Sequence, residues 1–429
     1  MDSLTYIQLL RRNHSFRRLW IGQVISELGN WFNFIAVLGL VRVVSHAAPE
    51  VTTIVLIARL VPFTLFAPLA GAFVDRWSRR TVMIVTDFLR VAVALGPLLI
   101  RGPQDLWIAY VCTVLLSVFG TFFEAAKNAA VPNITGERDL LAGNALMFSS
   151  RFLLMALGAA LGGWTAAYVG YSAAFIINAI SFIGSAYSVW LVPEEETRQR
   201  RVEVVQMAQA ASLYRGYWSD IREGWSYIVT HAPVAAILAI NIIWAIGGGA
   251  SNLIADRLGA LVFADESGIK PDSAVAALYF AAGMGLFLGM LIARRVGIYF
   301  QMKQRTVAFI GWSLLIQGIL FGLSGVMPTL WSSCVLLLIS RALLGAEFAV
   351  QETLLMRLVR DDLRGRVSTT DRAGEMLIWA LSTGLAGWSL HLISARTLTV
   401  IAGLLSGVAG IVWLVLFASG WVRLPRTLR

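Results

Sequence analysis

Long runs of apolar residues, separated by short polar segments, make up most of this chain of 429 residues. A helix needs roughly 20 apolar residues to cross the hydrocarbon core of a bilayer, and these runs have that length. They predict twelve membrane-spanning helices, over residues 19–41, 51–74, 81–100, 106–131, 140–168, 171–192, 232–255, 273–293, 305–326, 329–356, 367–393 and 397–422. Polar breaks separate most of these spans, whereas only a glycine turn near Gly170 divides the fifth from the sixth.

The composition supports a membrane environment. Apolar residues make up 58% of the chain and charged residues only 14%, against roughly 25% charged in a typical soluble domain. A soluble fold could not cover so much apolar surface, so lipid is expected to cover the remainder. Residues 1–15 are polar and basic, and the first apolar run has no small-residue cleavage site, so we expect the first span to remain in the mature protein.

The distribution of basic residues predicts the orientation of the spans. Of the 35 Lys and Arg residues, 26 lie on one side of the predicted spans, five on the other and four inside spans. Because cytoplasmic loops carry the excess of positive charge, both termini are predicted to be cytoplasmic, in a bacterial-type inner membrane. The net charge of +10 is dispersed in short clusters between apolar runs, so no nucleic-acid partner is expected.

The longest polar segment divides the chain into two halves. It predicts an N-terminal six-helix half over 1–192, a cytoplasmic linker over 193–231 and a C-terminal six-helix half over 232–429. Ile221, Trp225 and Ile228 stand at helical spacing in the linker and predict an amphipathic helix at the membrane interface. An all-α fold with two six-helix halves is typical of secondary transporters.

The loop between the second and third predicted spans carries a family motif. It reads Gly71-Ala-Phe-Val-Asp75-Arg76-Trp77-Ser78-Arg79-Arg80 and resembles the G-x-x-x-D-R-x-x-R-R/K loop of the Major Facilitator Superfamily. With its surroundings, it resembles the branch that contains the enterobactin exporter and the macrolide efflux pumps. The resemblance implies twelve helices in two pseudo-symmetric halves, alternating access, a proton gradient as the energy source and no cofactor.

The charges of this loop have a physical role of their own. Asp75 can accept hydrogen bonds from a helix N-terminus or an arginine, and Arg76, Arg79 and Arg80 can reach acidic groups or lipid phosphates. Such a cluster would latch the two halves on the cytoplasmic side. The alternative is that the arginines only determine topology.

A glycine pattern in the fifth span, Gly158, Gly162 and Gly163, resembles the antiporter motif G-P-x-x-G-G of the family. Ala159 stands where proline is common, so the pattern keeps the close helix approach but lacks the proline kink. Simple packing of small residues is the alternative interpretation.

An ionisable residue inside a span is costly, so each one is a functional candidate. Glu27 lies near the middle of the first span, and helical spacing places Gln23 and Asn30 on the same polar face. A carboxylate in a partly dry cavity could bind a proton on one side of the membrane and release it on the other. Alternatively, Glu27 only forms a hydrogen bond with a neighbouring helix.

Other charged residues extend this set of candidates. Further proton-coupling candidates are Glu124, Glu347 and Glu375, and further cavity or substrate candidates are Arg59, Lys127, Arg151 and Arg341. Each arginine could anchor an anionic substrate or pair with a carboxylate, and pairing is expected for most of them. Two pairs stand one helical turn apart and are expected to interact: Asp87 with Arg90, and Glu124 with Lys127.

Together these features predict a proton-coupled exporter of amphiphilic small molecules, such as drug-like compounds or siderophores. The chain has no G-x-x-x-x-G-K-[ST] loop and is not expected to hydrolyse ATP or to be an enzyme. The expected partners are membrane lipids, protons and the substrate, with a monomeric protein and no metal. The stretch Glu124-Ala-Ala-Lys127 resembles the Ser-Pro-Ala-Lys of lysophospholipid transporters and leaves lipid transport as an alternative. A non-transporting receptor or scaffold is the alternative from another class.

Overall fold

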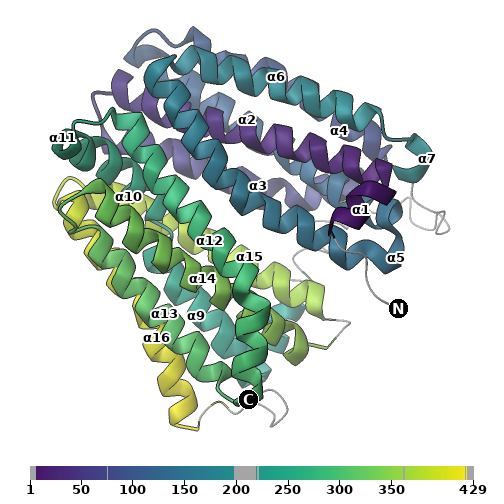
Figure 1. Ribbon diagram of the computed structural model, residues 1–429, viewed down its shortest axis with the longest axis vertical. Helices are drawn as coiled ribbons and strands as arrows, with labels where there is room; N and C mark the ends of the chain where they lie inside the picture. Colours follow the sequence, from purple (N-terminus) through teal and green to yellow (C-terminus); the bar gives the residue numbers. More distant parts are fainter. Residues whose placement is uncertain are drawn as a thin grey trace. The chain divides into compact units, whose positions relative to one another are not determined.

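The chain folds into two compact helical units. The structure is a computed structural model that describes residues 6–74, 76–197, 219, 222–360, 363–420 and 422, apart from the side chain of residue 137. Contacts group the chain into Met1–Tyr217 and Trp218–Arg429, which we call the first and second units. No described residue lies in a β-strand, so the predicted all-α membrane fold is confirmed (Figure 1).

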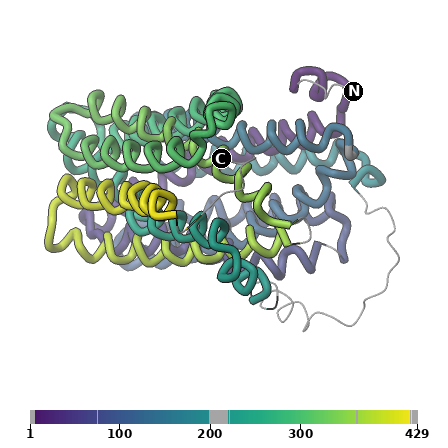
Figure 2. Tube along the Cα trace, turned by 90° about the horizontal axis from the view of Figure 1, so that it is seen from below, coloured from purple at the N-terminus to yellow at the C-terminus, as the bar shows by residue number. Residues whose placement is uncertain are grey.

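The first unit is a bundle of long helices that lie alongside one another (Figure 2). Its elements are α1 (Tyr6–Arg12), α2 (His14–Val44), α3 (Pro49–Val74), α4 (Arg79–Leu95), η1 (Gly96–Leu99), η2 (Pro103–Asp105), α5 (Leu106–Tyr168), α6 (Tyr171–Trp190) and α7 (Glu194–Thr197). Helix α2 packs against both α5 and α6, and α5 also contacts α3 and α4. The side chain of Asn13 caps α2 by accepting a hydrogen bond from the backbone N–H of Phe16 at 2.8 Å.

The second unit is also a helical bundle. Its elements are α9 (Ala232–Gly248), α10 (Ser251–Leu258), η3 (Gly259–Phe263), α11 (Ala264–Ser267), α12 (Pro271–Met302), α13 (Thr306–Ser324), α14 (Leu330–Leu358), α15 (Arg364–Ser389) and α16 (Ala395–Ala418). Helix α14 packs against α12 and α13, while α16 packs against α13 and α9. The hydroxyls of Thr329 and Ser394 cap the N-termini of α14 and α16.

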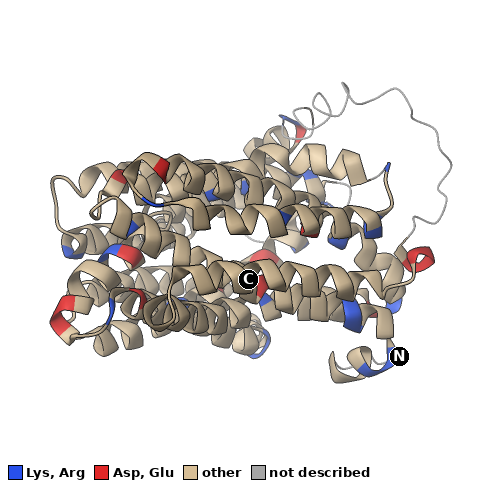
Figure 3. Cartoon of the chain, turned by 90° about the horizontal axis from the view of Figure 1, so that it is seen from above, with Lys and Arg blue, Asp and Glu red and all other residues tan. Residues whose placement is uncertain are grey.

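Eleven helical segments in the described ranges are long and apolar enough to cross a membrane. The twelfth predicted span, over 367–393, corresponds to α15, whose first half carries several charged residues. Its 26 residues correspond to about 39 Å at 1.5 Å per residue, which is enough to cross the hydrocarbon core. Figure 3 shows that charged residues are sparse along the helices of both units.

The boundary between the predicted fourth and fifth spans is a sharp kink at Gly136. The element labelled α5 comprises two helical spans, one that ends at Gly136 and one over Arg138–Tyr168, and Gly136 has the non-helical angles φ 69° and ψ 169°. A positive φ is accessible to glycine without a steric penalty, so the chain reverses here without a loop. At the next boundary, Gly170 has φ 110° and forms the predicted tight turn between α5 and α6.

The prediction for the seventh span is wrong at its C-terminal end. The hydropathy pattern predicts that this span ends at residue 255 and places Arg257 outside it, but the helical path continues to Ser267 through α10, η3 and α11. Asp256 and Arg257 are almost fully buried there, and Arg257 Nε lies 3.7 Å from Asp256 Oδ2. Burial of both charges is possible because they lie next to each other, a pairing that the hydropathy pattern does not reveal.

The segment before α9 packs onto the second unit. Residues 222–230 are helical, and the side chain of Ile228 is buried while Trp225 remains exposed. Glu223 Oε1 lies 2.5 Å from Arg366 Nη1 of α15. Ile221, the remaining residue of the predicted amphipathic pattern, lies outside the described residues.

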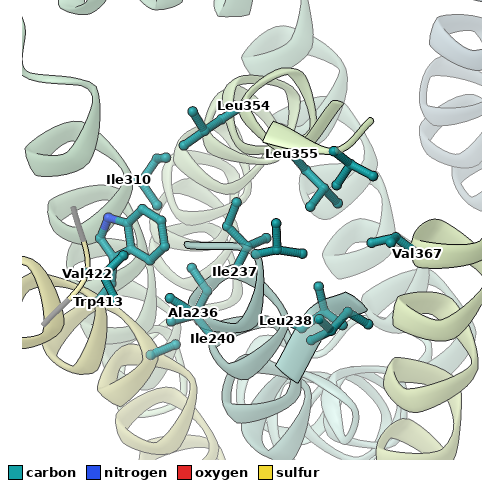
Figure 4. Close-up of a cluster of buried hydrophobic side chains, with 14 of the residues drawn as sticks. Ala236, Ile237, Leu238, Ile240, Ile310, Leu354, Leu355, Val367, Trp413 and Val422 are labelled. Atoms are coloured by element: carbon teal, nitrogen blue, oxygen red, sulfur yellow. The ribbon is translucent and has the colours of Figure 1, made fainter. Parts of the chain in front are cut away.

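A cluster of buried side chains holds α9, α13, α14 and α16 together (Figure 4). Trp413 of α16 is fully buried in it beside Ile240 and Ile310, and its indole N–H donates a hydrogen bond to the carbonyl of Val307 at 2.9 Å. In contrast, many apolar side chains elsewhere are exposed, such as Leu385 and Trp388, which is expected of surfaces that face lipid.

We expect Trp413→Phe to lower the free energy of unfolding by about 1 kcal/mol, because it deletes the buried hydrogen bond to Val307. The loss is larger if the smaller phenylalanine ring leaves a cavity in the cluster. Chemical denaturation in mixed detergent–lipid micelles measures the change. Trp331→Phe is the matched control, because Trp331 is 66% exposed and its substitution should leave stability unchanged. Equal stability losses in the two variants would contradict the role of the Val307 hydrogen bond.

Candidate functional site

Four of the predicted residues meet inside the first unit. Arg151 Nη2 of α5 lies 3.5 Å from Glu27 Oε1 of α2 and 3.6 Å from Glu124 Oε2 of α5. Lys127 Nζ, one turn after Glu124, lies 2.6 Å from Glu124 Oε1. We call these four residues the charge network. Arg151 therefore bridges two carboxylates that come from different helices.

The kink in α5 makes this network possible. Glu124 and Lys127 precede Gly136, and Arg151 follows it, so the network requires the two halves of α5 to lie side by side. Helix α2 packs against α5 and contributes Glu27 to the same place. Three segments that are separate in sequence thus supply two positive and two negative charges.

The members of the network differ in exposure. The Lys127 side chain is only 4% exposed, whereas the Arg151 side chain is 45% exposed, and Glu27 and Glu124 lie between these values. Lys127 therefore acts as a fixed partner of Glu124. Arg151 is the most exposed member of the charge network.

The polar face of α2 only partly joins this network. Gln23 is buried and donates a hydrogen bond to the carbonyl of Met147 at 3.2 Å, while its Oε1 atom has no hydrogen-bond partner in the described part of the chain. Asn30 is half-buried on the same helix. Arg59 of α3 lies over the ring of Phe34, with 4.0 Å between the guanidinium carbon and the ring centroid. This cation–π contact gives Arg59 a structural role.

Asp87 and Arg90 form the pair that their spacing predicts. Both side chains are almost fully buried in α4, and Arg90 donates a hydrogen bond to Asp87. The guanidinium carbon of Arg90 lies 4.5 Å from the ring centroid of Phe123 and 4.4 Å from that of Phe182. The pair therefore links α4 to α5 and α6 by packing as well as by charge.

The arginines of the family loop bind backbone carbonyls within the first unit. Arg79 Nη1 donates to the carbonyl of Thr197 at 3.4 Å, and Arg80 donates to the carbonyl of Trp190. These contacts attach the start of α4 to the end of α6 and to α7. Gly71 and Arg76 are exposed. Asp75, the acidic residue of the motif, lies outside the described residues.

The glycines of the predicted packing motif lie where α5 meets α2. A Cβ atom added to Gly158 would lie 2.7 Å from Cβ of Trp31, and one added to Gly162 would lie 2.9 Å from Cα of Phe32. Gly163 is buried next to them. The small residues thus allow the close approach that brings Glu27 towards Arg151.

The second unit holds a different polar group. Asn241 Nδ2 of α9 lies 3.0 Å from Asp371 Oδ2 of α15, and Gln351 Nε2 of α14 lies 2.6 Å from Asn241 Oδ1. We call these three residues the amide cluster. None of the three was among the candidates predicted from the sequence. Each is a polar residue within a predicted span, and a search for such residues would have identified them.

The remaining candidates lie near the amide cluster in sequence but do not pair as expected. Glu375 follows Asp371 by one turn of α15, and Glu347 precedes Gln351 by one turn of α14. Arg341 was expected to pair with Glu347 or Glu375, but it forms no ion pair with any described residue. Its guanidinium carbon instead lies 4.6 Å from the ring centroid of Phe321.

We expect Asn241→Ala to lower the free energy of unfolding by about 2 kcal/mol, because it leaves a buried amide of Gln351 and the Asp371 carboxylate without this partner. The loss should appear in chemical denaturation of the purified protein. Asn144→Ala, at an exposed position of α5, is the matched control and should be neutral. If Asn241→Ala is as stable as this control, the hydrogen bonds of the amide cluster do not contribute to the free energy of unfolding.

The described residues contain no group of three or more His, Cys, Asp or Glu side chains that could hold a metal ion. The charge network itself holds two carboxylates and two cationic side chains, which form ion pairs with one another.

Comparisons with known proteins agree with this architecture. The sequence profile described as the Major Facilitator Superfamily matches residues 19–368. The chain is 20% identical to macrolide efflux protein A of Streptococcus pyogenes over 379 residues, which cover 86% of this chain and 87% of that protein. It is 26% identical to the uncharacterized MFS-type transporter YfiS of Bacillus subtilis over 192 residues, which span 45% of each chain.

Solved structures show the same fold. A bacterial homologue of the iron transporter ferroportin, in an inward-facing state, aligns with a TM-score of 0.65 at 15% sequence identity. The alignment covers 93% of this chain and 98% of that protein. With the family profile spanning most of both units, these matches show that the chain is a membrane transporter of the Major Facilitator Superfamily.

Proposed function

We propose that this transporter is a proton-coupled exporter of amphiphilic small molecules, in which the charge network couples proton movement to substrate movement. The observation that carries the proposal is the position of Arg151, which lies at nearly equal distances from Glu27 and Glu124. With two positive and two negative side chains, the network is neutral when all four residues are charged.

Protonation of Glu27 changes this balance. It removes one of the two carboxylate partners of Arg151 and leaves the network with one excess positive charge. The deprotonated Glu27 carboxylate can instead accept a cationic or hydrogen-bond-donating group of the substrate, because Arg151 is exposed and keeps Glu124 as a second partner. Protonation of Glu27 then displaces that group, and the excess positive charge opposes its return. Proton and substrate thus compete for one carboxylate, as an antiporter requires.

The relatives support export as the direction of transport. Macrolide efflux protein A is similar to this chain over most of both lengths, and its name describes efflux of macrolides. The charge distribution in the sequence supports a bacterial-type inner membrane with both termini in the cytoplasm. We propose a monomer that needs no cofactor other than the proton gradient.

The alternatives from the sequence gain no support from the site. A lysophospholipid transporter would need the cation at position 127 to meet a phosphate, but Lys127 is buried and paired with Glu124. A receptor or scaffold is not consistent with membership of a transporter family.

Transport assays with the full-length protein in proteoliposomes test this function. A pH gradient is imposed across the vesicle membrane, and uptake into inside-out vesicles is measured for macrolides, siderophores, cationic dyes and lysophospholipids. We expect gradient-dependent accumulation of at least one amphiphilic compound and none of lysophospholipids. If no compound in the panel responds to the pH gradient, while an imposed sodium gradient drives accumulation, the proposal of proton coupling is wrong.

A further inference from the structure

A polar cavity lies at one end of the first unit, away from the charge network. Its volume is about 550 Å³, and its lining includes Leu9, Arg12, His14, Arg138, Asp139 and Glu196. These residues come from the junction of α1 and α2, the turn after Gly136 in α5, and α7. Three predicted spans begin or end at these points, so the cavity lies at the level where the helices leave the hydrocarbon.

The cavity brings together charges of both signs that do not neutralise one another. Arg12 and Arg138 are positive, and Asp139 and Glu196 are negative, but no ion pair within 4.0 Å joins any of them to a residue in the described part of the chain. The Oδ1 atom of Asp139 is buried and has no hydrogen-bond partner among the residues that the structure describes. Arg12, Arg138 and Glu196 are exposed, so their charges are available to a ligand that carries both signs.

We propose that this cavity binds the headgroup of a phospholipid that carries both a phosphate and a primary ammonium group, as phosphatidylethanolamine does. The guanidinium groups of Arg12 and Arg138 suit the phosphate, since the planar fork of arginine matches its oxygens. The carboxylates of Asp139 and Glu196 suit the ammonium group. The Oδ1 atom of Asp139 can accept a hydrogen bond from an N–H donor, which a primary ammonium supplies and a trimethylammonium group does not.

The surroundings favour a membrane lipid over a free phosphate compound. Leu9 contributes an apolar wall to the cavity. Ile7 of α1 is 65% exposed and Leu141, two residues after Asp139, is 79% exposed. Exposed apolar side chains beside a charged cavity offer contact to acyl chains while the headgroup occupies the cavity.

Native mass spectrometry of the full-length protein tests the proposal. The protein is reconstituted in nanodiscs with equal amounts of phosphatidylethanolamine, phosphatidylcholine and phosphatidylglycerol of identical acyl chains, and the retained lipids are counted after release. We expect phosphatidylethanolamine to be enriched. Glu196→Gln and Arg12→Gln should each lower this enrichment about fivefold, which corresponds to the loss of one exposed charge pair.

The chain provides matched controls beside both residues. Glu195→Gln and Arg11→Gln change adjacent exposed residues that do not line the cavity, and they should retain the enrichment. Arg12→Lys should restore part of the enrichment that Arg12→Gln loses. The readout is independent of transport, so it can fail while the proposed export function holds.

Several outcomes would overturn the proposal. Equal retention of phosphatidylcholine would show that no primary ammonium is recognised, and preferential retention of phosphatidylglycerol would show a simple anion site. If free phosphoethanolamine displaced the bound lipid at concentrations equal to those of the lipid itself, the acyl chains would contribute nothing and the ligand would be a soluble compound. Equal losses in the control variants would show that the cavity is not the binding site.

Discussion

Glu27→Gln is expected to abolish accumulation of the substrate against its gradient while leaving the protein folded. The glutamine side chain has nearly the same shape as that of glutamate. Its amide cannot bind and release a proton, so protonation can no longer break the contact with Arg151. A pH difference of one unit supplies about 1.4 kcal/mol for each coupled proton, which sustains about tenfold accumulation. The variant should reduce this ratio to about one, measured in proteoliposomes with an imposed pH gradient.

Exchange of labelled for unlabelled substrate without a gradient distinguishes loss of coupling from loss of binding. We expect Glu27→Gln to retain exchange, because Arg151 and Glu124 remain in place. Glu195→Gln, an exposed carboxylate on α7, is the matched control and should behave as the unaltered protein. Full accumulation by Glu27→Gln would show that the coupling carboxylate lies elsewhere, and loss of both activities would indicate a structural role for Glu27.

Gly318→Ala is expected to be among the most destabilising substitutions in the second unit, with a loss of about 3 kcal/mol. Helices α13 and α16 approach each other through glycines, and a Cβ added at Gly318 would lie 2.5 Å from Cα of Gly407 and 2.6 Å from the carbonyl oxygen of Gly403. Both atoms belong to the backbone, so the two helices must separate to admit one methyl group. Chemical denaturation in mixed micelles measures the effect.

Gly120→Ala is the matched control, since it makes the same change in another long helix where an added Cβ meets no atom within 4 Å. There the substitution should leave stability unchanged or raise it by up to about 1 kcal/mol, because alanine favours the helix more than glycine does. If both variants lose equal stability, the effect of Gly318→Ala does not come from contact between α13 and α16.

The candidate residues of the charge network could be identified from sequence, but their arrangement could not. A charge inside an apolar run is visible by itself, and this rule identified Glu27, Glu124, Lys127 and Arg151 separately. Their convergence depends on the kink at Gly136 and on the contact between α2 and α5. The same rule did not distinguish Arg151, which has two carboxylate partners, from Arg341, which has an aromatic one.

The amide cluster illustrates a different limit. Asn241 and Gln351 are neutral and stand in helices that otherwise read as apolar, so a search for intramembrane charges passes over them. Only the proximity of α9, α14 and α15 shows that they share hydrogen bonds with Asp371. A polar side chain in a span has to find a partner, but the sequence does not name that partner.

The sequence by itself determined that the chain is an all-helical membrane protein, because the length and spacing of apolar runs follow directly from the thickness of the bilayer. It also determined which residues are costly enough inside a span to be candidates for function. The tertiary structure decided that the helical path continues past the predicted end of the seventh span at Arg257, and that a kink at Gly136 separates the fourth span from the fifth. It also decided which charges meet, because ion pairs depend on distances of a few ångströms between segments far apart in the chain.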